Sequence, residues 1–264
     1  MPRLFAFVVA VVLCPSLVSA AGPLIVVGGG AVGPEIVAKA LELGGGRSAV
    51  VAVLPQASEE PDAGEASVKD FLAAGAKSAA IVPFDATDAD AAIRRATLIW
   101  IPGGDQNRFM QLVQRAGLAD VIRERHRAGV PVGGTSAGAA VMADAMFTGD
   151  ADLTSLTTGA TVIAKGLGLW PEVLIDQHFL KRQRDNRLIS AVMDRPSLVG
   201  VGIDEGTAVI VRGDVFEVLG ASSVVVIDAR LAHVEQPGRG ALVSGRDVKL
   251  SILHSGQSYS LADR

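Results

Sequence analysis

The stretch Gly129–Met142, GVPVGGTSAGAAVM, decides the fold of this chain. Its β-branched residues predict a short buried strand, and the alanines that follow predict a helix. Between them, residues 134–138 form the pattern Gly-x-Ser-x-Gly. This pattern is typical of a nucleophile elbow, a sharp turn that exposes a serine between a strand and a helix. We therefore predict that Ser136 is a nucleophile.

The surroundings of this serine also suit the stabilisation of negative charge. A helix that begins directly after Ser136 presents backbone N–H groups to an anion, so Ala137 is a natural oxyanion donor. A second donor is expected from the loop Pro102–Asn107, where the N–H of Gly104 or a neighbour follows another buried strand. An ordinary glycine-rich turn is the alternative interpretation of that loop.

Strands and helices alternate from Leu24 to Met146. Apolar runs predict strands near 24–27, 49–54, 79–82 and 98–101, with helical segments between them. This order is typical of a parallel sheet covered by helices on both faces. We therefore predict an α/β fold, a three-layer αβα sandwich with a mainly parallel sheet. Residues 21–264 are expected to form one domain that becomes β-rich from about residue 207.

A second glycine motif follows the first predicted strand. Residues 28–33, GGGAVG, match the dinucleotide-binding pattern G-x-G-x-x-G. The second strand ends in Pro55–Gln56, however, where an acidic residue is expected to bind the ribose. The two interpretations are a nucleotide site and a tight turn that lets the strand approach its helix.

The composition excludes several classes of function. The 264 residues carry a formal charge of −4, so the chain lacks the basic surface of a nucleic-acid-binding protein. Cys14 is the only cysteine and lies within the predicted leader, which leaves the mature chain without disulfides or thiolate chemistry. Asp150 and Asp152 lack the spacing of metal ligands, so no metal is expected.

The first 20 residues resemble a secretory signal peptide. Arg3 gives a positive start, Leu4–Leu13 is an apolar run too short for a membrane anchor, and Val18–Ser19–Ala20 suits a cleavage site. An N-terminal core helix is the alternative. We expect a secreted or periplasmic protein with no membrane association after cleavage.

A histidine is needed to activate the serine. His178 follows the strand-like run Val173–Ile175, which would deliver it to the carboxyl edge of a sheet. We therefore predict that it is the base. Asp204 or Glu205 could orient it. Arg184 and Arg187 share a helical face and either bind substrate carboxylates or form a solvated basic face.

Five motifs together resemble the cyanophycinases, serine peptidases related to α-aspartyl dipeptidase. The motifs are Ile101–Gln106, Gly133–Ala139, Asp176–Phe179, Arg182-x-Arg184-x-x-Arg187–Leu188 and Gly202–Ala208. The resemblance covers roughly residues 23–230. It implies a fold like that of class I glutamine amidotransferases, with serine as the nucleophile.

The resemblance also implies a substrate and a site. Cyanophycinases cut the poly-aspartate backbone of cyanophycin, which carries arginine on each β-carboxylate, and release β-Asp-Arg dipeptides. The implied nucleophile, base and orienter are Ser136, His178 and Glu205. The implied substrate-binding residues are Asp105, Asp176, Gln177, Arg182, Arg184 and Arg187. No cofactor is implied.

Three other functions compete with this one. An aspartyl dipeptidase would act only on small Asp-containing peptides, a nucleotide-binding protein would use the loop at 28–33, and an inactive protein would only bind extracellular polymer. The expected partners of the chain are cyanophycin or Asp-Arg peptides. A second copy of the chain is a candidate partner.

Overall fold

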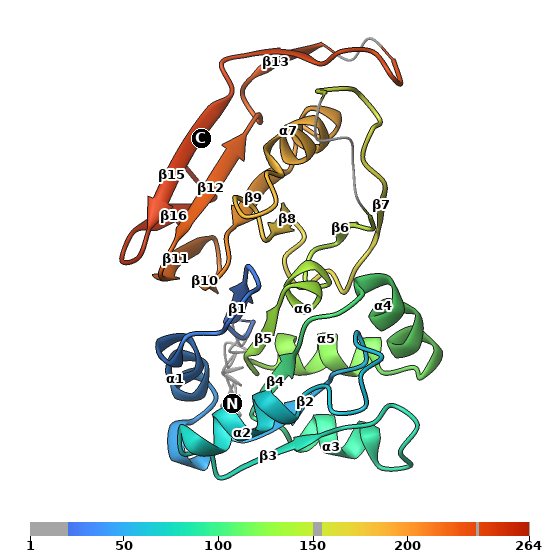
Figure 1. The fold of residues 1–264 in the computed structure, drawn as a ribbon, viewed down its shortest axis with the longest axis vertical. Coiled ribbons are helices and arrows are strands. Elements are labelled where there is room, and N and C mark those ends of the chain that lie inside the picture. Colours follow the sequence, from blue (N-terminus) through green and yellow to red (C-terminus); the bar gives the residue numbers. More distant parts are fainter. Residues whose placement is uncertain (1–20, 150–154, 236–237, 264) are drawn as a thin grey trace, which may run out of the picture.

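The computed structural model describes residues 21–149, 155–235 and 238–263. Along the long axis of the molecule, the helix-covered parallel strands lie at one end and a smaller, mostly antiparallel β region lies at the other (Figure 1). The predicted signal peptide, Cys14, Asp150 and Asp152 lie outside the described residues.

The main sheet contains eight strands in the order β16-β11-β10-β1-β5-β4-β2-β3. Strands β1 to β5 are parallel to one another, whereas β10, β11 and β16 continue the sheet with antiparallel pairing. Their bounds are β1 Leu24–Val27, β2 Val50–Val53, β3 Ser78–Ile81, β4 Leu98–Ile101, β5 Val132–Thr135, β10 Thr207–Arg212, β11 Val215–Gly220 and β16 Ser258–Ser260.

Helices cover both faces of the parallel strands. Alternate residues of a strand point to opposite faces, so Val26 packs with α3, α4 and α5 while Ile25 packs with α1 and α2. The helices are α1 Pro34–Leu43, α2 Glu65–Ala73, α3 Ala89–Arg95, α4 Gln106–Arg115, α5 Ala119–Arg127, α6 Ala137–Ala140 and α7 Asp185–Asp194, with a 3-10 turn at Gly46–Ser48. The predicted α/β fold with a mainly parallel central sheet is confirmed.

A second sheet has four strands in the order β15-β12-β9-β8. One of its faces joins the core of the main sheet, and α7 covers the other. Its strands are β8 Val173–Gln177, β9 Val199–Ile203, β12 Ser223–Asp228 and β15 Lys249–His254. Two small hairpins pair β6 Ala145–Phe147 with β7 Ile163–Lys165, and β13 His233–Glu235 with β14 Ser244–Arg246.

The strand that precedes His178 belongs to this second sheet. In the main sheet, the strand next to β1 on the side away from β5 is β10, and β3 is the last strand at the opposite edge. Strand β8 is not part of this sheet and pairs with β9. The serine and histidine therefore come from different sheets. No helix within the described ranges is long and apolar enough to cross a bilayer.

Candidate active site

Ser136 occupies a strained turn between β5 and α6. Its backbone has φ 54° and ψ −112°, and a positive φ is uncommon for a residue with a side chain. Its N–H donates to the carbonyl of Val27 at 3.0 Å, which ties the turn to β1. A Cβ at Gly134 would lie 2.7 Å from the carbonyl oxygen of Ile101, so a glycine is needed here for the turn to pack against β4. The strand-to-helix turn predicted at this serine is therefore present.

Three side chains form a hydrogen-bonded row across the two sheets. The Ser136 Oγ lies 2.8 Å from Nε2 of His178, and Nδ1 of His178 lies 2.6 Å from Oε1 of Glu205. Asp204 is held elsewhere, because its carboxylate accepts from the N–H of Lys181 at 2.9 Å and from the hydroxyl of Ser222 at 2.8 Å. Glu205 is thus the acid that contacts the imidazole, in the arrangement of a nucleophile, a base and an orienting acid.

The glycine loop after β1 forms the platform for this row. The ring of His178 lies against Gly29, where an added Cβ would be 2.5 Å from Nε2 and 2.7 Å from Nδ1. At Gly30 an added Cβ would lie 2.9 Å from the Cβ of Glu205. The carbonyl of Gly28 accepts from the N–H of His178 at 2.6 Å, and that of Gly29 accepts from Gly206 at 2.9 Å. The glycines therefore face the imidazole of His178 and the carboxylate of Glu205, which occupy the space above the loop.

Two backbone segments lie next to the serine hydroxyl. Ala137 is the first residue of α6, a position whose N–H has no acceptor within the helix. Since α6 has only four residues, its dipole adds little, and the N–H itself is the useful group. Gly103 lies beside the serine, because a Cβ there would be 3.9 Å from Oγ. Gly104 packs against Ala57 with φ 140°, so Gly103 is the better-placed loop residue, and the donor role of Gly104 stays a prediction.

Burial lowers the pKa of His178, the base of this row. Desolvation lowers the pKa of His178 below its usual 6.5, and this effect outweighs the hydrogen bond that His178 donates to Glu205, which raises the pKa. The nearby charge of Arg182 lowers the pKa further. A neutral imidazole can accept the serine proton at neutral pH.

A cavity of about 570 Å³ lies beside the Gly103–Gly104 loop, and its lining includes Gly104. Glu59, Glu60 and Asp105 contribute carboxylates to it. Asp105 caps α4 by accepting from the N–H of Asn107 at 2.7 Å, and Glu59 pairs with Arg108 at 2.9 Å. Arg108 also lines the cavity and pairs with Glu59, so Glu60 and Asp105 supply the remaining negative charge for a cationic group beside the Gly103–Gly104 loop.

Comparisons with known proteins agree with this geometry. The model of peptidase family S51 matches residues 24–219. The chain belongs to peptidase family S51. It is 35% identical over 240 residues to a cyanophycinase of Geminocystis herdmanii, covering 86% of this chain and 88% of that one. It is 34% identical to a cyanophycinase of a Nostoc species, covering 88% and 82%.

A solved structure shares the fold of this S51 peptidase. The crystal structure of a peptidase from an acI-B1 actinobacterium superposes with a TM-score of 0.66 and covers 92% of this chain and 98% of its own. Its sequence identity is 22%, so the likeness concerns the fold alone. The membership in family S51 confirms that the chain is a serine-type peptidase, as the five motifs predicted.

Two residues predicted to contact substrate are instead buried in this S51 peptidase. Asp176 has no exposed surface, and both of its oxygens accept from Arg187, one of them from Nε at 2.9 Å. The guanidinium of Arg187 also donates to the carbonyl of Gly149 at 2.9 Å and lies 4.8 Å from the ring centre of Phe147. The structure departs here from the predicted groove, because the arginine faces the core side of its helix.

Gln177 and Arg184, which were also predicted to bind substrate, are buried as well. Arg184 is 6% exposed and donates to both the carbonyl and the side-chain oxygen of Gln177 at 2.6 Å, and it lies 3.5 Å from Asp176. These four residues form a buried polar cluster beneath the strand end that carries His178. Arg182, by contrast, is exposed near His178 and fits the predicted substrate contact.

We expect Arg187→Ala to destabilise the protein by about 3–5 kcal/mol, because it leaves the buried carboxylate of Asp176 without its partner. Urea unfolding followed by circular dichroism measures the difference. Arg182→Ala is the matched control and should change stability by less than about 0.5 kcal/mol, since that side chain is exposed. A loss below about 1 kcal/mol in Arg187→Ala would show that the pair is not structurally important.

Within the described ranges, no group of three or more His, Asp or Glu side chains lies close enough to hold a metal ion.

Proposed function

We propose that this S51 peptidase is an exported cyanophycinase that hydrolyses the poly-aspartate backbone of cyanophycin and releases β-Asp-Arg dipeptides. The observation that carries the proposal is the hydrogen-bonded row of Ser136, His178 and Glu205. It stands in a chain whose relatives at 34–35% identity over most of their length are cyanophycinases.

The proposed reaction has two acyl-transfer steps. The Oγ of Ser136 attacks the carbonyl carbon of an α-peptide bond while Nε2 of His178 takes the hydroxyl proton. The N–H groups of Ala137 and of the Gly103–Gly104 loop hold the oxyanion. The C–N bond then breaks, and His178 returns the proton to the departing amine. Water, deprotonated by His178, cleaves the acyl-enzyme and restores Ser136.

The charges around the row match such a substrate. Each unit of cyanophycin bears a guanidinium and an α-carboxylate on its side branch. Glu59, Glu60 and Asp105 face the cavity next to Gly104 and suit the guanidinium, while exposed Arg182 suits a carboxylate. A substrate with both charges therefore finds groups of complementary charge near the catalytic row.

The deciding experiment offers purified cyanophycin to the mature protein and identifies the products by mass spectrometry. β-Asp-Arg dipeptides should appear, and the Ser136→Ala protein should produce none. Cleavage of Asp-X dipeptides with the polymer left intact would instead assign the chain as an aspartyl dipeptidase.

We also propose that the mature protein begins near Ala21, based on the cleavage pattern at Val18–Ser19–Ala20. N-terminal sequencing of protein recovered outside the cytoplasm tests this. Secreted protein that still begins with Met1 would contradict it.

The acid limb of the pH profile should lie below pH 6.5, because burial lowers the pKa of His178 and only the neutral imidazole accepts a proton. Activity should therefore rise with pH through that pKa and then level off. In Glu205→Gln the hydrogen bond that raises this pKa is weakened, so the limb should move to still lower pH. Profiles of kcat/KM from about pH 4 to 8 for both proteins measure this. A limb that moves upward in the variant would exclude Glu205 as the partner of His178.

A further inference from the structure

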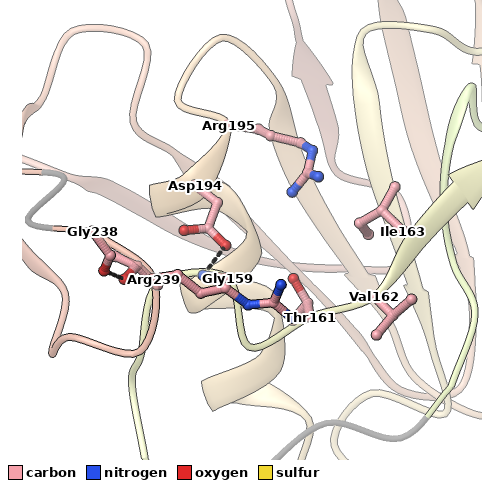
Figure 2. A pocket seen from close by; sticks show the side chains of 9 residues that line it. Gly159, Thr161, Val162, Ile163, Asp194, Arg195, Gly238 and Arg239 are labelled. Carbon is pink, nitrogen blue, oxygen red and sulfur yellow. Dashed lines mark hydrogen bonds between the residues drawn. The ribbon is translucent and has the colours of Figure 1, made fainter.

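A second cavity, of about 680 Å³, lies at the end of α7 that carries Asp194 and Arg195 (Figure 2). His178 and the rest of the catalytic row lie at the other end of this helix. Asp194 and Arg195 at the end of α7 line one part of it, and Thr161 and Arg239 line another. Since α7 has ten residues at about 1.5 Å each, the cavity lies about 15 Å from the end of the helix near His178. It is therefore separate from the site that contains Ser136.

The walls of this cavity are held together by backbone pairing. The N–H of Thr158 donates to the carbonyl of Ala241 at 2.9 Å, and the carbonyl of Thr158 accepts from Gly240 at 2.8 Å. The stem of Arg239 crosses Gly159, where an added Cβ would lie 2.8 Å from its Cγ. The position of Arg239 is therefore set by packing against the opposite segment.

Positive charge and an unused donor point into the cavity. Figure 2 shows the side chains of Arg195 and Arg239 reaching into it from different segments. Neither guanidinium has a hydrogen-bond or ion-pair partner in the part of the chain that the structure describes. Thr161 is only 8% exposed, yet its Oγ1 has no partner among the described residues. Leaving a buried hydroxyl unsatisfied costs free energy, which a ligand with acceptor oxygens would recover.

The chemistry of these groups suits a carboxylate. Guanidinium groups bind carboxylates through paired N–H donors, and the threonine hydroxyl can donate a further bond. Asp194 supplies the opposite charge, with its Oδ2 accepting from the N–H of Gly159 at 2.7 Å. Two arginines and one aspartate give a net positive cavity on a chain with a formal charge of −4. A ligand that carries a carboxylate next to a guanidinium matches this mixture.

We propose that this cavity is a distal subsite that binds the α-carboxylates of arginine branches along the polymer, away from the bond being cut. The inference rests on the proposed cyanophycinase function. A peptide chain extends about 3.3–3.6 Å per residue, so at least about four to five aspartates are needed to reach from one end of α7 to the other. The subsite therefore contributes to binding only for substrate chains of at least about this length.

The test compares long and short substrates of the active enzyme. We expect the double variant Arg195→Ala/Arg239→Ala to raise KM for cyanophycin about tenfold or more, because charged hydrogen bonds are lost. Its kcat and its KM for a peptide of three β-Asp-Arg units should not change, because that peptide is too short to reach the subsite. Arg246→Ala removes an exposed positive charge from β14 of the adjacent hairpin and is the matched control. It should leave both substrates unaffected.

Two further outcomes would overturn the proposal. An unchanged KM for the polymer would show that the arginines do not bind it, and an equal rise for both substrates would place their effect at the reacting bond or in the fold. The glutamine variants Arg195→Gln/Arg239→Gln, checked by thermal melting, keep the packing and remove the charge. Failure of the proposed function is recognised separately, since the unmodified enzyme would then not cleave cyanophycin at all.

Calorimetry with the free β-Asp-Arg dipeptide separates polymer from product as the source of the carboxylate. Titration into the Ser136→Ala protein should show weak binding compared with cyanophycin fragments. Binding of the dipeptide that is as tight as that of the fragments, and is lost in the double variant, would make the cavity a product site and would refute the polymer assignment.

Discussion

Ser136→Ala should lower kcat for cyanophycin hydrolysis by about 10⁴-fold or more, because it removes the hydroxyl that accepts the acyl group. This hydroxyl lies 2.8 Å from Nε2 of His178. His178→Ala should cost a similar factor, since the serine then keeps its proton. The double variant should be little worse than either single variant, because both changes disable the same step. Initial rates of dipeptide release, measured by mass spectrometry, provide the comparison.

Glu205→Gln is the graded control for this series. It should cost less than the loss of Ser136 or His178, because the nucleophile and the base remain and only orientation and imidazolium stabilisation suffer. Full activity of pure Ser136→Ala protein would refute the serine mechanism. Additive losses in the double variant would show that Ser136 and His178 act in separate steps.

Gly29→Ala should lower kcat/KM by about 100-fold or more while the protein stays folded. An added Cβ would lie 2.5 Å from Nε2 of His178, so the ring must move away from Ser136, and a displacement of about 1 Å can cost 10² in rate. Gly75→Ala is the matched control, because Gly75 has φ 99°, close to the 107° of Gly29, but nothing lies within 4 Å of its added Cβ. It should show the backbone strain of a positive φ without the catalytic loss.

The two glycine variants separate positioning from stability. Both should lower the melting temperature by similar small amounts, whereas only Gly29→Ala should lose turnover. If Gly75→Ala loses as much activity as Gly29→Ala, general strain explains the effect and the glycine loop has no special role beneath His178.

Local features of the site could be predicted from the sequence. The elbow is specified by glycines two residues before and after Ser136, where neighbouring backbone leaves no room for a Cβ. The parallel sheet follows from apolar runs that alternate with helical segments. His178 could be predicted because a polar cluster ends a buried run, even though that run belongs to the second sheet.

Long-range features could not be predicted. Asp204 and Glu205 are adjacent and chemically alike. The fold selects the glutamate for the imidazole, because Asp204 is held by Lys181 and Ser222 while Glu205 lies against the loop at Gly28–Gly30. The spacing of Arg184 and Arg187 shows that they share a helical face, but it does not show that this face is turned toward Asp176. The glycine pattern at 28–33 resembled a nucleotide loop because both functions require a backbone without side chains.

The division of the row between two sheets has a consequence during synthesis of the chain. Ser136 is synthesised before His178 and Glu205, and β16 at Ser258–Ser260, which completes the main sheet, is synthesised after all three. A nascent chain therefore holds a serine with no base beside it. Proteolytic competence therefore arises only when the second sheet docks, so a chain that ends before β8 has a serine but no base to activate it.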